Sequence, residues 1–125
     1  MKMVLALLAI LLVHHLHGQS KDKVMKKEEL SCRLTSRELQ ERKETILADL
    51  RRKIIQKTEE GNGYRYTFPA GDEMMDELIA FIKTERQCCD FFDYQLSVSG
   101  KGSNLEMVIS GPQGAKEFVR QELGL

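Results

Sequence analysis

Two glycine-containing turns place the strongest limit on the fold of this chain, because each is flanked by residues that alternate as they do in β-strands. The first turn, Gly61-Asn62-Gly63, precedes the alternating aromatic segment 64–68. The second turn, residues 100–104, lies between segments 94–98 and 105–109, whose apolar residues recur at every second position. The sequence therefore predicts two β-hairpins.

The segment before the first hairpin has the spacing of an amphipathic helix. Thr35 and Glu38 match a capping box, in which a hydroxyl and a carboxylate each accept an amide proton at a helix start. Apolar residues then recur at helical intervals, namely Leu39, Ile46, Leu50 and Ile54. We therefore expect one helix over residues 36–52 that buries this face.

Two further segments have the apolar spacing of helices, one between the two hairpins and one after the second. Asp72 is expected to cap a second helix, whose apolar face holds Met75, Leu78, Ile79, Ile82 and Cys89. The closing helix has the apolar residues Ala115, Phe118, Val119 and Leu123. The order α-β-β-α-β-β-α predicts an α+β fold, with an antiparallel four-stranded sheet of two hairpins covered on one face by helices.

The N-terminus has the pattern of a secretory signal peptide, because Lys2 precedes an apolar run and a polar exit. The apolar run, residues 3–13, is shorter than the roughly 20 helical residues that cross a bilayer. We expect residues 1–18 to be cleaved and the protein to be periplasmic or extracellular, with no stable membrane span. Residues 19–31 are then a charged flexible tether and residues 32–125 a single domain.

The charge and the histidines exclude several functions. Without residues 1–18 the chain has 18 basic and 19 acidic residues, a net charge of −1. No long basic block is present, so we predict no binding to nucleic acid, and nothing in the sequence identifies a protein partner. All three histidines lie in the leader, so the mature protein lacks Ser/His/Asp and Cys/His catalytic systems.

The chemically distinctive residues are the three cysteines, Cys32, Cys88 and Cys89. A disulfide between the neighbours Cys88 and Cys89 requires a strained ring, so a bridge from Cys32 to one of them is favoured. Alternatively, converging thiolates form a site for a soft metal ion such as Cu, Zn or a heavier thiophilic ion. The sequence leaves both alternatives open.

The expected helices give the cysteines different surroundings. Cys88 and Cys89 lie at a helix C-terminus, where the helix dipole disfavours a thiolate, whereas Cys32 lies just ahead of a helix N-terminus. Glu85 and Arg86 precede the pair and are candidates for supporting the thiols from outside the site. The alternative is that the aliphatic parts of both side chains lie along the edge of the core while their charged groups stay in water.

Several motifs together resemble a group of small, largely uncharacterised bacterial proteins. They are Cys-Arg-Leu-Thr (32–35), Glu-Arg-Gln-Cys-Cys (85–89) with Phe91-Phe92 behind it, and Gly-Pro-Gln-Gly-Ala-Lys-Glu-Phe (111–118). In that group a proline usually follows the double cysteine, where this chain has Asp90. Some members are associated with heavy-metal resistance, so the resemblance implies a metal-linked role.

The leading hypothesis is a non-enzymatic, exported thiol module that binds a soft metal ion through Cys32, Cys88 and Cys89. Its rival is a structural or interaction domain in which a Cys32 bridge to the pair only stabilises the fold. A thiol-dependent oxidoreductase is disfavoured, because the chain has no Cys-x-x-Cys motif and no histidine after the leader.

Overall fold

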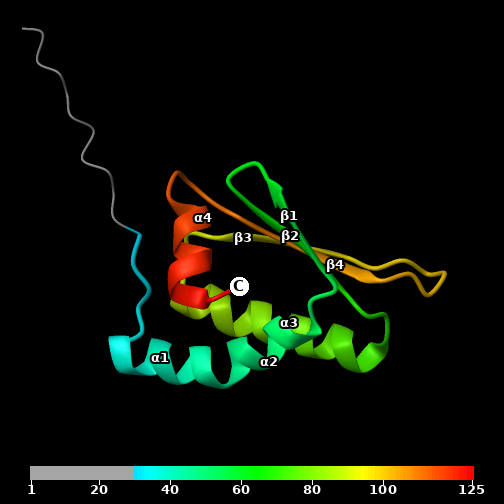
Figure 1. Cartoon of the computed structure of the whole chain (residues 1–125), viewed down its shortest axis with the longest axis horizontal. Coiled ribbons are helices and arrows are strands. Elements are labelled where there is room, and N and C mark those ends of the chain that lie inside the picture. The colour runs from blue at the N-terminus through cyan, green and yellow to red at the C-terminus, as the bar shows by residue number, and fades with distance from the viewer. Residues whose placement is uncertain (1–29) are drawn as a thin grey trace, which may run out of the picture.

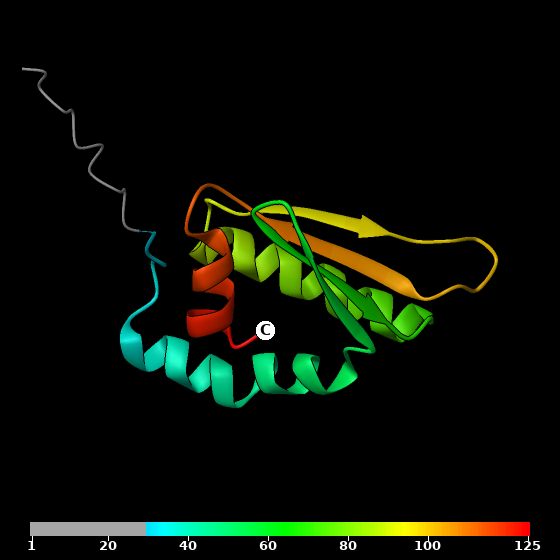
Figure 2. The same cartoon turned by 45° about the horizontal axis from the view of Figure 1, so that its top comes forward.

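The computed structural model describes residues 30–125, so the predicted signal peptide and most of the tether lie outside the described residues. The two predicted hairpins are β1 (Gln56–Glu60) with β2 (Gly63–Phe68), and β3 (Asp93–Ser97) with β4 (Leu105–Ser110). They join through β2 and β4 into one antiparallel four-stranded sheet of order β1-β2-β4-β3. Figures 1 and 2 show the helices gathered on one face of this sheet, so the predicted α+β architecture is confirmed.

The two central strands supply the sheet side of the core. Tyr66 of β2 lies opposite Met107 of β4, and both side chains are fully buried. The alternate positions on either side are also buried, namely Tyr64, Phe68, Leu105 and Ile109. The edge strand β1, by contrast, is exposed along its whole length. Charged residues on such an edge discourage pairing with another chain.

The first predicted helix is divided in two, α1 (Ser36–Glu44) and α2 (Ile46–Lys53). The Thr45 hydroxyl donates to the carbonyl of Glu41, a bond that bends helices, and the Thr45 backbone leaves the helical conformation. The break changes the rotational phase of the second half, so α2 buries Leu47 and Leu50 and leaves Ile46 53% exposed. The expectation of one continuous apolar face through Ile46 was therefore wrong.

The second predicted helix is α3 (Asp72–Cys88), and it also faces the core differently from our expectation. Gly71, not Asp72, is its N-cap, and Asp72 lies in the first turn. The buried face consists of Met74, Leu78, Phe81, Glu85 and Cys88. Met75 and Ile82 are half-buried and Ile79 is exposed. Phe81 is larger than Ile79 and gains more from burial, so Phe81 lies on the buried face. The carboxylate of Glu85 can lie on the same face because Arg42 compensates its charge.

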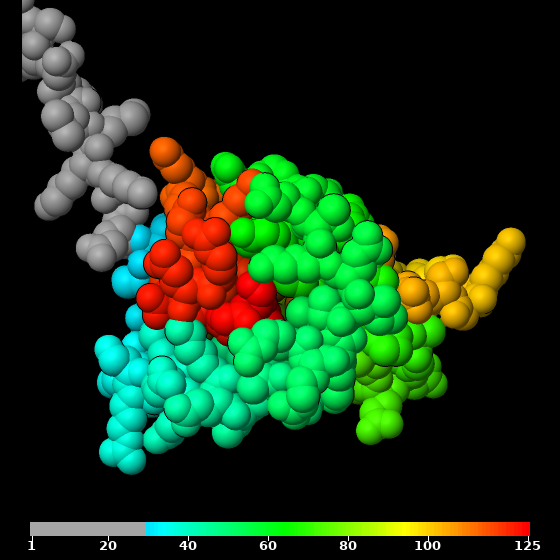
Figure 3. All heavy atoms as spheres, in the orientation of Figure 1, coloured from blue at the N-terminus to red at the C-terminus, as the bar shows by residue number. Residues whose placement is uncertain are grey.

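The C-terminal segment closes the core. It forms one turn of α-helix, α4 (Ala115–Phe118), and continues as a turn of π-helix, η1 (Val119–Leu123). All four apolar residues predicted for the closing helix are buried. Figure 3 shows this segment (red) between α1 and α2 (cyan to teal) and the first hairpin (green). Gly114 starts α4 at φ 97°, in the left-handed region that favours glycine.

Residues 30–125 contain no helix with both the length and the apolar character needed to cross a bilayer.

Candidate thiol site

The segment ahead of α1 brings Cys32 to the cysteine pair. The amide of Arg33 donates a 2.9 Å hydrogen bond to the carbonyl of Cys88, which fixes this segment against the end of α3. The Cys32 side chain lies close enough to the pair to raise the pKa of both Cys88 and Cys89. The structure therefore brings the three predicted cysteines together, and all three are free thiols.

The three thiols differ in their access to solvent. Cys89 is fully buried and Cys88 is 8% exposed, whereas Cys32 is half-buried. Burial raises the pKa of Cys89, and its interaction with Cys32, in which Cys89 is the donor, raises the pKa further. Burial also raises the pKa of Cys88, against the opposing charge of Arg42. The pair is thus held as neutral thiols. The sequence predicted this direction from the helix dipole, but burial is the main cause.

The end of α3 explains why both neighbouring cysteines are buried. Cys88 is the last helical residue, and its side chain continues the buried face of α3. Cys89 is the C-cap, with φ −128° and ψ 79°, so it has left the helical path. The helical wheel that placed the two thiols about 100° apart does not apply across this boundary.

A buried ion pair lies directly behind the thiols. The Arg42 guanidinium donates a 2.6 Å hydrogen bond to the Glu85 carboxylate, which is fully buried, and lies 3.5 Å from the Cys88 sulfur. Burial raises the pKa of Glu85, while the charge of Arg42 and hydrogen bonds from Arg42 and Cys89 lower it. Glu85 therefore holds the Arg42 guanidinium in place beside the Cys88 sulfur from within the core.

Two buried oxygen atoms beside these groups have no hydrogen-bond partner within the described residues. They are Glu85 Oε1 and the hydroxyl of Tyr94 on β3. Burial raises the pKa of Tyr94, and the nearby charges of Glu85 and Cys89 act in the same direction. A buried polar atom without a partner is costly, so these atoms mark a part of the core that is not optimised for stability alone.

The guanidinium at this site comes from a residue that the sequence analysis missed. Arg86, the predicted candidate, is exposed, and Arg42 on α1 takes the position at the thiols. A signal for Arg42 was present, because it lies three residues after Leu39 and four before Ile46, on the predicted apolar face. A charged residue in such a position needs a buried partner, and Glu85 is that partner.

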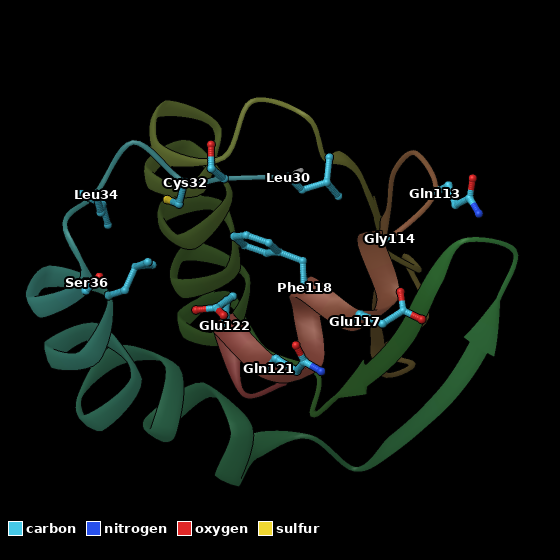
Figure 4. Close-up of a pocket in the computed structure, with 12 residues that line it drawn as sticks. Leu30, Cys32, Leu34, Ser36, Gln113, Gly114, Glu117, Phe118, Gln121 and Glu122 are labelled. Carbon is cyan, nitrogen blue, oxygen red and sulfur yellow. The ribbon is translucent and has the colours of Figure 1, made fainter. Parts of the chain in front are cut away.

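A surface groove opens beside Cys32 (Figure 4), with a volume of about 720 Å³. Leu30 and Leu34 flank Cys32 on one wall, and Phe118 of α4 points toward them from the other. Glu117 and Glu122 line the groove as well, whereas no lysine or arginine of the described part of the chain does so. Cys32 is therefore the thiol through which solvent and solutes reach the site.

Across residues 30–125, no group of three or more histidine, cysteine, aspartate or glutamate side chains has the arrangement of a metal site. Comparisons of the chain with models of protein families, with curated proteins and with solved structures found no match. The resemblance to the bacterial family therefore stays a prediction, and the function has to be argued from the thiol site.

Proposed function

We propose that this protein is an exported thiol module that binds a soft metal ion, with Cys32 as the accessible ligand and Cys89 as the buried one. The observation that carries the proposal is the hydrogen bond from Arg33 to Cys88, which holds the segment of Cys32 beside both thiols of the pair. Thiolate sulfur selects soft ions. The proposed site needs two thiols, so it does not depend on a preformed group of three or more ligands.

The composition of the site favours one class of ion. Zinc takes four ligands in structural sites, whereas Cu(I) and heavier thiophilic ions accept a lower coordination number with sulfur. Glu85 already pairs with Arg42, so its carboxylate is engaged in the core. We therefore favour Cu(I) or a heavier thiophilic ion over zinc. Binding must displace thiol protons, so the apparent affinity should rise with pH.

Titration of the reduced protein with Cu(I) under anaerobic conditions, against a chromogenic competitor, tests this proposal. We expect one tightly bound ion per chain, and loss of binding in Cys32→Ser with the far-UV circular dichroism unchanged. Ser31→Ala is the matched control, because Ser31 lines the same groove without a thiol. Binding that persists in Cys32→Ser but disappears in Cys88→Ser would assign the site to the vicinal pair instead.

The same contact supports a second candidate, a structural disulfide from Cys32 to Cys88 or Cys89. Such a bridge typically stabilises a domain by about 2 to 4 kcal/mol. Thiol counting on denatured protein from the native host separates the two functions. Three titratable thiols support metal binding, whereas a single thiol supports the bridge.

A further inference from the structure

We propose that Cys32 and Cys89 form a redox-active dithiol that reduces small organic disulfides bound in the groove beside Cys32, with a preference for amine-bearing ones. This activity is separate from metal binding and requires no metal. It uses the same two sulfur atoms, so a bound ion would block it.

The two thiols have the unequal exposure that stepwise disulfide exchange requires. Cys32 is half-buried and lines the groove, so a solute can reach its sulfur. Cys89 is fully buried and out of reach of a solute, and the Arg33 to Cys88 hydrogen bond holds the Cys32 segment beside it. An accessible thiol therefore meets the substrate, and a protected thiol completes the reaction.

The structure also indicates which member of the pair reacts with Cys32. The Arg42 guanidinium contacts the Cys88 sulfur at 3.5 Å, which leaves Cys89 as the buried thiol that can react with Cys32. The backbone hydrogen bond from Arg33 to Cys88 holds the segment that carries Cys32 beside the end of α3. This arrangement assigns the bridge to Cys32 and Cys89.

The reaction balances in two steps. Cys32 loses its proton to water, and its thiolate attacks one sulfur of the substrate RS–SR, which forms Cys32–S–SR and releases RS⁻. The first RS⁻ takes a proton from water. Cys89 then attacks the Cys32 sulfur, the bond to the second RS group breaks, and the proton of Cys89 passes to that leaving group. The dithiol is oxidised to a disulfide, and RS–SR is reduced to two RSH molecules.

The groove gives the substrate class. Its volume of about 720 Å³ lies in the range of small-molecule sites, about 300 to 1,000 Å³. The side chains of Leu34, Leu39 and Phe118 offer apolar contact to the carbon chain of a substrate. Glu117 and Glu122 provide negative charge, and no lysine or arginine of residues 30–125 lines the groove, so an amine is favoured over a carboxylate.

The test uses the full chain, reduced and free of metal, with cystamine and dithiodiacetate as disulfides of opposite charge. The rate of the protein with each disulfide is divided by the rate of N-acetylcysteine with the same disulfide. This normalisation removes the difference in intrinsic reactivity between the two disulfides. We expect a normalised preference for cystamine, and a loss of about fivefold in that preference for each of Glu117→Gln and Glu122→Gln. Equal normalised rates for the two disulfides would overturn the substrate class.

Mass spectrometry of the products tests the two thiols. The unaltered chain should release two cysteamine molecules and lose two protein thiols, whereas Cys89→Ser should stop with one cysteamine half attached to Cys32. Cys32→Ser and Cys32→Ala should both lose reaction by more than tenfold, with Ser31→Ala, which lines the same groove without a thiol, as the control. Accumulation of the mixed disulfide in Cys88→Ser instead of Cys89→Ser would overturn the pairing. Because Cu(I) binding is measured without disulfide, failure of either activity is distinguishable from failure of the other.

Discussion

Arg42 on α1 donates a 2.6 Å hydrogen bond to Glu85 on α3, and this contact joins the first helix to the core directly behind the thiols. The Arg42 side chain is 12% exposed and that of Glu85 is fully buried, so the pair is largely removed from water. α1 itself has no fully buried residue. The ion pair is therefore an important attachment of α1 to the rest of the domain.

Breaking this pair from one side should be costly. Arg42→Met leaves the Glu85 carboxylate buried without its counter-charge, and we expect the free energy of unfolding to fall by about 3 to 5 kcal/mol. The double variant Arg42→Met with Glu85→Leu should recover most of this loss, because it removes the buried charge as well. Urea denaturation measures both values. A loss below about 0.5 kcal/mol in the single variant would show that solvent screens the pair.

Glu85 should also give the stability a specific dependence on pH. Its pKa in the folded protein is raised by burial above the unfolded value of about 4.3, so the folded state binds this proton more tightly. The contribution of Glu85 to stability is therefore complete below about pH 4.3 and is lost as the pH rises through the folded pKa. The Glu85→Gln variant has no ionisable group at this position and so lacks this loss. The difference in free energy of unfolding, variant minus unaltered protein, should therefore increase with pH. Urea titrations from pH 4 to pH 8 test this, and a constant difference would contradict it.

The face of α3 that packs on the core can be checked with two neighbouring residues. Leu78 is fully buried and Ile79 is 37% exposed. Leu78→Ala should reduce the free energy of unfolding by about 2 to 5 kcal/mol, since it leaves a cavity. Ile79→Ala is the matched control and should change it by about 0.5 kcal/mol or less. Similar losses in both variants would mean that the helix is rotated relative to the structure.

The sequence predicted the hairpins, the sheet and the closing helix because each depends on local patterns. Alternation around a glycine turn defines a hairpin, and the capping box at Thr35 and Glu38 forms as expected. The faces of α2 and α3 were harder to predict. The break at Thr45 and the buried charge of Glu85 both depend on tertiary contacts, which a helical wheel does not contain.

Only part of the thiol site could be predicted, because local patterns reveal its cysteines but not its tertiary contacts. Cys32 precedes the first helix and the pair ends the second predicted helix. Both of these helix ends could be predicted from the sequence, so the proximity of Cys32 to the pair could be predicted as well. The role of Arg42 depends on Glu85, which lies 43 positions away in the chain, and no local pattern links the two residues. A charged residue on a predicted apolar face was the available signal.

The cap of α1 provides a further prediction, since this helix positions Arg42. The Thr35 hydroxyl accepts a hydrogen bond from the amide of Glu38, and Thr35→Ala should destabilise the domain by about 0.5 to 2 kcal/mol. Amide exchange should rise mainly in α1. Thr84→Ala is the control, because the Thr84 hydroxyl only donates to the carbonyl of Ala80 within α3, and its loss should be nearly neutral. Unchanged exchange in α1 would show that the cap does not hold the helix.

Processing of the N-terminus remains a prediction outside the described residues. We expect the mature protein to begin near Gln19, because a basic residue, an apolar run and a polar exit precede it. Intact-mass measurement on protein recovered from the native host gives the answer. Retention of residues 1–18 would contradict both the cleavage and the predicted export.

The break at Thr45 divides one stretch of helical sequence into two helices that differ in how much of their surface is buried. The buried residues of α2, Leu47 and Leu50, belong to the core, and substitutions there would endanger the whole domain. α1 contributes Arg42 to the thiols and otherwise presents its side chains to solvent or at partly covered positions. Apart from Arg42, substitutions in α1 should therefore disturb the core less than substitutions in α2.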